Sequence, residues 1–183
     1  MPMSKRSDSG FTLLELLVVI AVIGIIAAIA IPGLLRARIA GNEASAIGSM
    51  RVVNSSQTAY MSACGNGYYA SNLIILGDPA PSGAGFISPD LTGALTIDKG
   101  GYELTMAEGS EAVAATRDGC NPSGVAADLY SSYYASNQPL VSGLSGTRWF
   151  WTNSLGTVYV SYSDDFDAED IGNEAPGVGE ALQ

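Results

Sequence analysis

The sequence predicts an α+β fold in which one long N-terminal helix packs against a small antiparallel β-sheet. Three observations lead to this expectation: an apolar run that starts after residue 10, an amphipathic stretch directly behind it, and several short strand-like segments in the second half. The 183 residues leave room for one compact domain beside the apolar run. We expect a leader at 1–10, an apolar helix at 11–35, its amphipathic continuation at 36–63, and a head with an acidic C-terminal tail at 64–183.

The apolar run has the length of a membrane span. From Phe11 to Ile31 its 21 residues carry a single charge, that of Glu15. A helix of this length covers roughly 30 Å, the thickness of the hydrocarbon core of a bilayer. Lys5 and Arg6 precede the run, so we expect the N-terminus to stay in the cytoplasm and the head to cross the membrane.

Two simpler interpretations of this run remain open. A secretory signal peptide has a shorter, acid-free apolar region and a small-x-small cleavage site, which residues 28–30 resemble. An unprocessed single-pass anchor also fits the length. Glu15 argues against both, because a carboxylate inside a span usually has a partner and a function. If the chain were cleaved after Gly10, the new α-amino group of Phe11 would lie four residues from Glu15. The amine of one subunit would then neutralise the carboxylate of its neighbour.

These residues resemble a known signal. Lys5-Arg6, Gly10, Phe11-Thr-Leu-Leu-Glu15-Leu, the apolar run and Pro32 are similar to the class III signal of type IV pilins and type II secretion pseudopilins. The resemblance covers residues 4–35. It implies the pilin fold, cleavage between Gly10 and Phe11 by a prepilin peptidase, N-methylation of Phe11, and a role for Glu15 in assembly.

The same resemblance implies the partners and the location of the protein. The precursor would cross the bacterial inner membrane once, meet the inner-membrane assembly machinery, and join copies of itself in a helical, extracellular filament. In filaments of this family the helix between positions such as Gly24 and Pro32 can melt. A simple proline kink at the membrane exit fits the sequence equally well.

After Pro32 the helical pattern continues to Ala63. A mostly apolar stripe follows alternating steps of four and three residues and consists of Ala46, Met50, Val53, Gln57, Tyr60 and Cys64. We expect this stripe to lie against the sheet, and the run Gly65-Asn66-Gly67 to end the helix.

The head begins with a connector at 68–101 that is rich in proline and glycine, so we expect loops there. Strand signals follow at 102–106, 127–135, 147–152 and 157–163, and the last two read as a hairpin. Trp149 and Trp151 alternate with Phe150, which places both on one face of their strand, where packing is the favoured role.

Cys64 and Cys120 are the two cysteines of the chain. In an oxidising compartment we expect them to form a disulfide, which by the loop-entropy model stabilises the fold by roughly 4 kcal/mol. Two unpaired thiols are the alternative. Such a disulfide would tie the end of the helix to the turn between the first two predicted strands, whereas the familiar pilin disulfide closes a C-terminal loop.

Composition excludes several classes of function. The net charge of -10 argues against general nucleic-acid binding, and the absence of histidine removes the commonest general base and metal ligand. Nothing in the sequence pairs a nucleophile with a base, so we expect no enzyme and no cofactor. Asn54-Ser55-Ser56 matches an N-glycosylation sequon, a pattern with many false positives.

An acidic cluster lies close to the C-terminus. Asp164, Asp165 and Asp167 are weak calcium candidates, since calcium prefers clustered oxygen ligands and major pseudopilins hold calcium in a C-terminal loop, but no EF-hand spacing is present. A solvated acidic tail followed by disorder from Gly172 to Gln183 is the simpler interpretation.

The sequence leaves three functions open. The first is a prepilin that polymerises into a type IV pilus, and the second is a type II secretion pseudopilin. The third belongs to another class: a membrane-anchored or secreted binding or hydrolytic domain.

Overall fold

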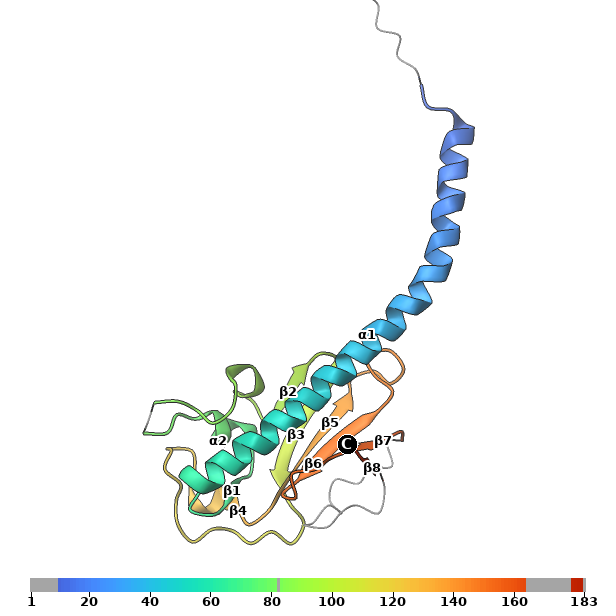
Figure 1. The fold of residues 1–183 in the computed structure, drawn as a ribbon. Coiled ribbons are helices and arrows are strands. Elements are labelled where there is room, and N and C mark those ends of the chain that lie inside the picture. Colours follow the sequence, from blue (N-terminus) through green and yellow to red (C-terminus); the bar gives the residue numbers. More distant parts are fainter. Residues whose placement is uncertain (1–9, 82, 164–178, 183) are drawn as a thin grey trace, which may run out of the picture. The chain divides into compact units, whose positions relative to one another are not determined.

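The computed structural model describes residues 10–81, 83–163 and 179–182. The chain divides into two compact units, one ending at Ala37 and the other beginning at Arg38. Helix α1 (Leu13–Ala63) starts in the first unit and ends in the second (Figure 1). The first unit consists of the apolar part of α1 and the residues before it, and the second contains all the strands.

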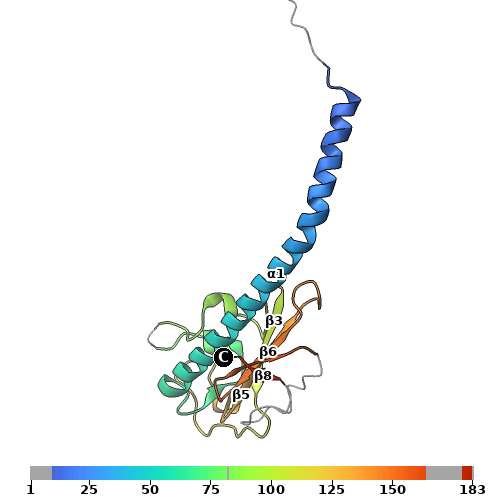
Figure 2. The same ribbon diagram turned by 45° about the vertical axis from the view of Figure 1, so that its right-hand side comes forward.

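The second unit is built around one antiparallel sheet. Its strands are β2 (Thr96–Lys99), β3 (Tyr102–Glu108), β5 (Tyr133–Pro139), β6 (Trp149–Asn153), β7 (Val158–Ser161) and β8 (Glu180–Ala181), paired in this order. The part of α1 that belongs to this unit lies across one face of the sheet, as Figures 1 and 2 show from two sides. The predicted α+β architecture is confirmed.

The core lies between α1 and the sheet. All six residues of the predicted helical stripe are buried: Ala46, Met50, Val53, Gln57, Tyr60 and Cys64. On β3 the predicted alternation also holds, because Tyr102, Leu104 and Met106 are buried in the same cluster. Burial of such side chains contributes roughly 1.5–3 kcal/mol each, so this face of α1 is a large part of the stability of the head.

The other face of the sheet has its own aromatic pair. Trp151 on β6 stacks on Tyr159 of the neighbouring strand β7, with ring centroids 4.2 Å apart and planes 15° from parallel. Phe150 points the opposite way, into the core beneath α1. The tryptophan therefore packs within the head, as its position on the strand predicted.

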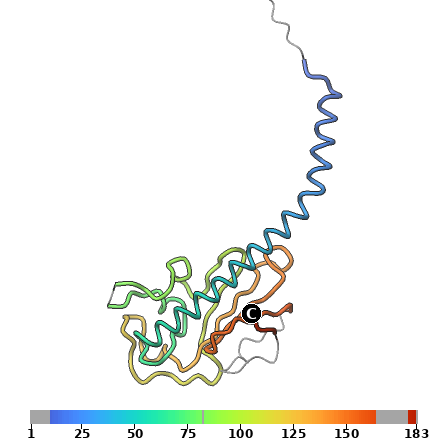
Figure 3. The backbone as a smooth tube through the Cα atoms, viewed as in Figure 1, coloured from blue at the N-terminus to red at the C-terminus, as the bar shows by residue number. Residues whose placement is uncertain are grey.

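The connector after α1 contains more structure than its proline and glycine content predicted. It forms β1 (Tyr69–Ala70), the short helix α2 (Leu73–Gly77) and the 3₁₀ turn η1 (Pro89–Leu91). Figure 3 traces the path of the backbone through this connector. The Asn72 side chain caps α2 by accepting from the backbone N–H groups of Ile74 and Ile75. This cap and the buried apolar run behind it explain the helix.

Gln57 fixes the start of the connector to α1. Its fully buried side chain donates to the carbonyl oxygen of Ala70 at 2.7 Å and accepts from the N–H of the same residue at 3.1 Å. The amide therefore pairs with β1 as a neighbouring strand would. On its other side, β1 pairs with β4 (Leu129–Tyr130) in a two-stranded sheet.

Three predictions for the head, one of a strand, one of a loop and one of disorder, were wrong in detail. The predicted strand at 127–135 is interrupted: η2 (Ala126–Asp128) and β4 come first, and β5 starts at Tyr133. Strand β2 lies inside the expected loop region, where it pairs with β3 across the turn at Gly100 and Gly101. Glu180 and Ala181 form β8, within the stretch expected to be disordered, because the outer edge of β7 offers unpaired backbone groups.

A disulfide closes the end of the helix. Cys64 and Cys120 are bonded with a sequence separation of 56, as predicted. In the chain-entropy model a loop of this length stabilises the fold by roughly 4 kcal/mol. Asn66 and Gly67 follow with φ of 52° and 91°, the left-handed conformation in which helices commonly end.

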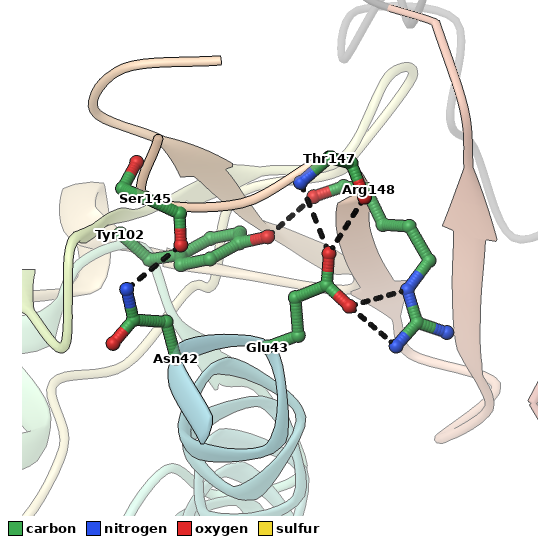
Figure 4. A network of polar contacts seen from close by, with 6 residues as sticks. All are labelled: Asn42, Glu43, Tyr102, Ser145, Thr147 and Arg148. Carbon is green, nitrogen blue, oxygen red and sulfur yellow. Dashed lines mark hydrogen bonds and ion pairs between the residues drawn. The ribbon is translucent and has the colours of Figure 1, made fainter. Parts of the chain in front are cut away.

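A buried ion pair joins α1 to the β5–β6 loop (Figure 4). The Glu43 side chain is 6% exposed and the Arg148 side chain 29%. One carboxylate oxygen of Glu43 accepts from the backbone N–H and the hydroxyl of Thr147, both at 3.0 Å. The other accepts from two guanidinium nitrogens of Arg148, at 2.8 and 2.6 Å.

The surroundings of Glu43 determine its protonation. Burial acts to raise the pKa of this carboxyl, but the hydrogen bonds from Thr147 and Arg148, together with the guanidinium charge, outweigh it and lower the pKa below 4.5. A carboxyl whose pKa is lower in the folded state contributes stability above its unfolded-state pKa, and this contribution is lost as the pH falls.

We predict that Glu43→Gln lowers the free energy of unfolding at neutral pH by about 2–3 kcal/mol, because the neutral amide loses the charge-assisted bonds to Arg148. The difference from the wild type should shrink as the pH falls from the unfolded-state pKa of about 4.5 through the lower pKa of the folded carboxyl, because the wild type then loses the same charge. Denaturant titration of the full chain in detergent micelles, followed by tryptophan fluorescence at several pH values, measures both quantities.

Asp90→Asn is the matched control. Asp90 pairs with Lys99 at 2.6 Å, but both side chains are well exposed, 53% and 39%. Solvent screens such a pair, so its removal should have a much smaller effect at neutral pH. Equal losses from the two variants would show that burial adds nothing to the Glu43 interaction.

Candidate functional site in the N-terminal segment

The predicted cleavage position lies outside the helix. Gly10 and Phe11 are exposed and precede α1, which starts at Leu13. A Cβ atom added at Gly10 would meet nothing within 4 Å. The peptide bond between the two residues is therefore free of helical hydrogen bonds, as a protease substrate requires. Lys5 and Arg6 lie outside the described residues.

Thr12 and Glu15 form a capping box at the start of α1. The Thr12 hydroxyl accepts from the N–H of Glu15 at 3.2 Å. In return, one oxygen of the Glu15 carboxylate, Oε2, accepts from the N–H and the hydroxyl of Thr12, at 2.9 and 2.7 Å. Such a box satisfies backbone donors that the first turn of a helix leaves without partners.

The capping box also explains how a carboxylate fits into an apolar segment. A charged group is costly in a medium of low polarity unless hydrogen bonds and an opposite charge compensate it. Thr12 supplies two of these hydrogen bonds from within the same turn, and both fall on Oε2. Thr12 supplies no charge, so the negative charge of Glu15 is still available to a cation from elsewhere.

The rest of this segment is an apolar helix whose side chains are exposed to solvent. Its large side chains are well exposed on every side, among them Leu13, Leu14, Leu17, Ile20, Ile23, Ile26, Ile29 and Leu34. Among the described residues, α1 is the one helix long and apolar enough to cross a membrane. The core helix of a water-soluble protein would be mostly buried, whereas none of this apolar window is.

Gly24 and Pro32 lie within the continuous helix. Pro32 has no N–H and cannot donate to the carbonyl oxygen of Ala28, so the backbone there lacks one bond of the α-helical ladder. Whether the segment between Gly24 and Pro32 opens in an assembly stays a prediction.

The remaining predicted sites fall into two groups. Cys64 and Cys120 are brought together as expected. Asp164, Asp165 and Asp167 lie outside the described residues, so the calcium prediction is untested. Within the part of the chain that the structure describes, His, Cys, Asp and Glu side chains form no group of three that could hold a metal ion.

Asn54, the sequon residue, is engaged in the fold. Its amide nitrogen donates to the carbonyl oxygen of Gly156 at 2.8 Å. Its amide oxygen accepts from the hydroxyls of Tyr133 and Thr152, each at 2.9 Å. These three bonds join α1 to the sheet and to the turn between β6 and β7.

A hollow of about 450 Å³ beside the disulfide shows no catalytic arrangement. Ten described residues line it, including Pro79, Pro81 and Pro122, and among these Asp118 is the one carboxylate. Acid–base or nucleophilic catalysis needs at least two cooperating groups, which this lining does not provide.

The sequence analysis missed two interactions, the capping bond of Thr12 and the ion pair between Glu43 and Arg148. Thr12 was not singled out, although Thr-x-x-Glu before an apolar run is the signature of a capping box. The Glu43–Arg148 ion pair was also missed. Here the sequence carries no signal, because 104 residues lie between the two partners and only the folded head brings them together.

The comparisons with known proteins agree with this site. Residues 5–31 match the family model described as the prokaryotic N-terminal methylation motif. The chain therefore carries a type IV pilin-like prepilin signal, and the family of this motif is one of structural subunits. Neither the curated proteins nor the solved structures gave a match.

We predict that Thr12→Val accelerates hydrogen exchange at the Glu15 amide by roughly 5-fold, the equivalent of one lost capping bond of about 1 kcal/mol. Valine keeps the shape of threonine and removes the hydroxyl that accepts from this N–H. Exchange measured on the uncut precursor in micelles tests the prediction. Thr12→Ser keeps the hydroxyl and should leave the rate unchanged, and equal rates in all three proteins would contradict the capping box.

Proposed function

We propose that this chain, which carries the signal of a type IV pilin-like prepilin, is the structural subunit of an extracellular type IV pilus. One observation carries the proposal: residues 5–31 match the methylation motif and form, from Leu13, a fully exposed apolar helix. Such a surface needs either lipid or other copies of the same helix around it. A subunit that leaves the membrane to polymerise uses both in turn.

In this proposal a prepilin peptidase cuts the bond between Gly10 and Phe11, and Phe11 is then N-methylated. The cut creates an α-amino group one residue before Thr12, at the end of the helix where Glu15 lies. The amine of an incoming subunit pairs with the Glu15 carboxylate of a subunit already in place. In an apolar environment the attraction between two such charges is strong, and it brings the two helices into a defined axial register.

The head is placed outside the cytoplasm by the charge bias of the leader. The Cys64–Cys120 disulfide supports this orientation, since such bonds persist in oxidising compartments. Before assembly the protein spans the bacterial inner membrane once, where it meets the assembly machinery. After assembly it is extracellular, and opening of α1 between Gly24 and Pro32 gives the filament elasticity.

A type II secretion pseudopilin is the closest alternative, because it shares the signal and the helix. The Cys64–Cys120 disulfide favours the pilin. Electron microscopy of fibres sheared from the surface of producing cells separates the two. Long fibres that react with an antibody against the head support the pilus, and their absence from cells that secrete normally supports the pseudopilin.

A membrane-anchored binding or hydrolytic domain is the alternative from another class. Such a protein needs no cut beside Phe11 and no carboxylate at Glu15. The lining of the hollow near the disulfide offers it no catalytic pair.

We predict that the mature protein begins at Phe11 and that its N-terminal residue carries one added methyl group. Mass spectrometry of the N-terminal peptide from producing cells measures both. Gly10→Val should leave the full-length precursor in the membrane, since a side chain at this position obstructs the peptidase. An N-terminus at Met1, Met3 or Ile31 in the wild type would rule out the filament subunit.

We predict that Glu15→Ala abolishes or strongly impairs filament assembly while membrane insertion and cleavage continue. The apolar surface that drives insertion is unchanged, and the charge that attracts the incoming amine is lost. Filament yield by shearing and immunoblot, beside carbonate extraction of membranes, measures the two steps. Asp98→Ala removes an exposed carboxylate from the head and should assemble normally. Normal filaments from Glu15→Ala would refute charge pairing.

A further inference from the structure

The loop between β5 and β6 presents three large aliphatic side chains to solvent. Leu140, Val141 and Leu144 are 47%, 52% and 57% exposed. The other large exposed apolar residues described after Arg38 occur singly along the chain. The loop also lies within a run without any charged residue, 129–147. We call Leu140, Val141 and Leu144 the aliphatic tip.

Several backbone groups of this loop are hydrogen-bonded within it. The carbonyl oxygen of Val141 accepts from the N–H groups of Leu144 and Ser145, at 3.1 and 2.9 Å. The Ser145 hydroxyl accepts from the N–H of Val141, and the N–H of Gly143 donates to the carbonyl oxygen of Gly146. Because these four donors are already paired, the loop loses fewer hydrogen bonds to water when it enters a less polar environment.

The loop is also fixed to α1. Asn42 donates from its side-chain amide to the carbonyl oxygen of Ser145 at 2.8 Å, and Glu43 holds Thr147 and Arg148 just beyond the tip, as Figure 4 shows. The aliphatic tip is therefore a rigid feature at the end of the sheet beside Asn42. It is not a flexible segment that happens to be exposed.

The position of Asn42 along the chain limits how far this end of the head can lie from the expected membrane exit. Asn42 follows Pro32, the expected membrane exit, by ten residues. At about 1.5 Å of helical rise per residue, ten residues separate the two by at most about 15 Å along the helix. Arg36 and Arg38 lie between them and match the phosphates of lipid headgroups in charge.

We infer that the aliphatic tip is a membrane contact: Leu140, Val141 and Leu144 insert into the interfacial region of the bilayer on the head side while the precursor awaits assembly. The inference rests on the proposed function, because it requires the span. The span supplies the lipid surface at a high effective concentration, so even a small apolar contact is occupied. Aliphatic side chains at this depth gain the transfer free energy of their buried area.

Lipid is favoured over a second copy of the chain as the occupant. The span brings every precursor to the bilayer surface, whereas contact with a second copy depends on its density in the membrane. The tip is also small, three side chains on one loop, while a stable protein interface needs far more buried area.

The test uses the full chain with a single added cysteine, Leu144→Cys, labelled with an environment-sensitive fluorophore. The two native cysteines form a disulfide and do not react. The protein is reconstituted in vesicles of phosphatidylethanolamine and phosphatidylglycerol, with or without lipids that carry a nitroxide quencher near the headgroup. Leu155→Cys is the matched control: Leu155 is 50% exposed, and its neighbour Gly156 binds Asn54, twelve residues further along α1 than Asn42.

We expect the nitroxide lipid to quench the probe at 144 several-fold more than the probe at 155, at every protein density. Exchange of Leu140 and Val141 for serine in the labelled protein should reduce the difference. Equal quenching at the two positions would overturn the inference. Shielding of the 144 probe that grows with protein density, without quenching by nitroxide, would also overturn it, since a second copy would then be the occupant.

Two further measurements distinguish failure of the membrane contact from failure of the proposed function. Carbonate extraction of the same vesicles reports whether the span is inserted, and the mature N-terminus reports whether the chain is cut at Phe11. An inserted, cleavable precursor with a solvent-exposed probe at 144 refutes the membrane contact alone. A chain that is extracted from the vesicles refutes the span on which both depend.

Discussion

One constraint shapes this protein: a single helix, α1, has to satisfy two different surroundings. Its first part is apolar on all sides and finds no cover within its own unit. Its second part is apolar on one side only and supplies one wall of the core of the head. The change takes place within a few residues, between Leu35 and Glu43. Among the described elements, no other helix of this length covers the sheet, so the head draws one wall of its core from the same helix that carries the apolar segment.

The polar side chains of α1 that bind the rest of the head determine how the helix is seated on the sheet. Apolar residues such as Met50 and Val53 contribute most of the buried area, but their contacts change little if the helix slides or rotates slightly. Hydrogen bonds are directional, and a buried polar group that loses its partner is strongly penalised. Glu43, Asn54 and Gln57 each bind an atom of the sheet, of its loops or of the connector. Spread over four turns of helix, these bonds fix its axial and rotational position.

The sequence was most informative where interactions are local. The apolar helix, the stripe from Ala46 to Cys64, the alternation on β3 and the helix end at Gly65 all follow from periodicity or backbone preference, and all are found. Predictions were wrong where contacts between distant residues decide. Strand β2 has little alternation of its own and forms because β3 folds back beside it. The Glu43–Arg148 pair and the role of Asn54 depend on the sheet being complete, which no local pattern records.

The capping box at Thr12 gives the proposed assembly step a physical basis. A carboxylate inside an apolar helix has two separate needs, hydrogen-bond donors and an opposite charge. Thr12 meets the first from within the same chain, through two bonds to one oxygen of Glu15. The second need remains, because hydrogen bonds disperse a charge without neutralising it. In the proposed assembly step, a subunit would thus be tolerated in the membrane on its own and would still be stabilised by an arriving amine. A fully neutral helix would lack the attraction, and a carboxylate without the capping bonds would be harder to retain in the membrane.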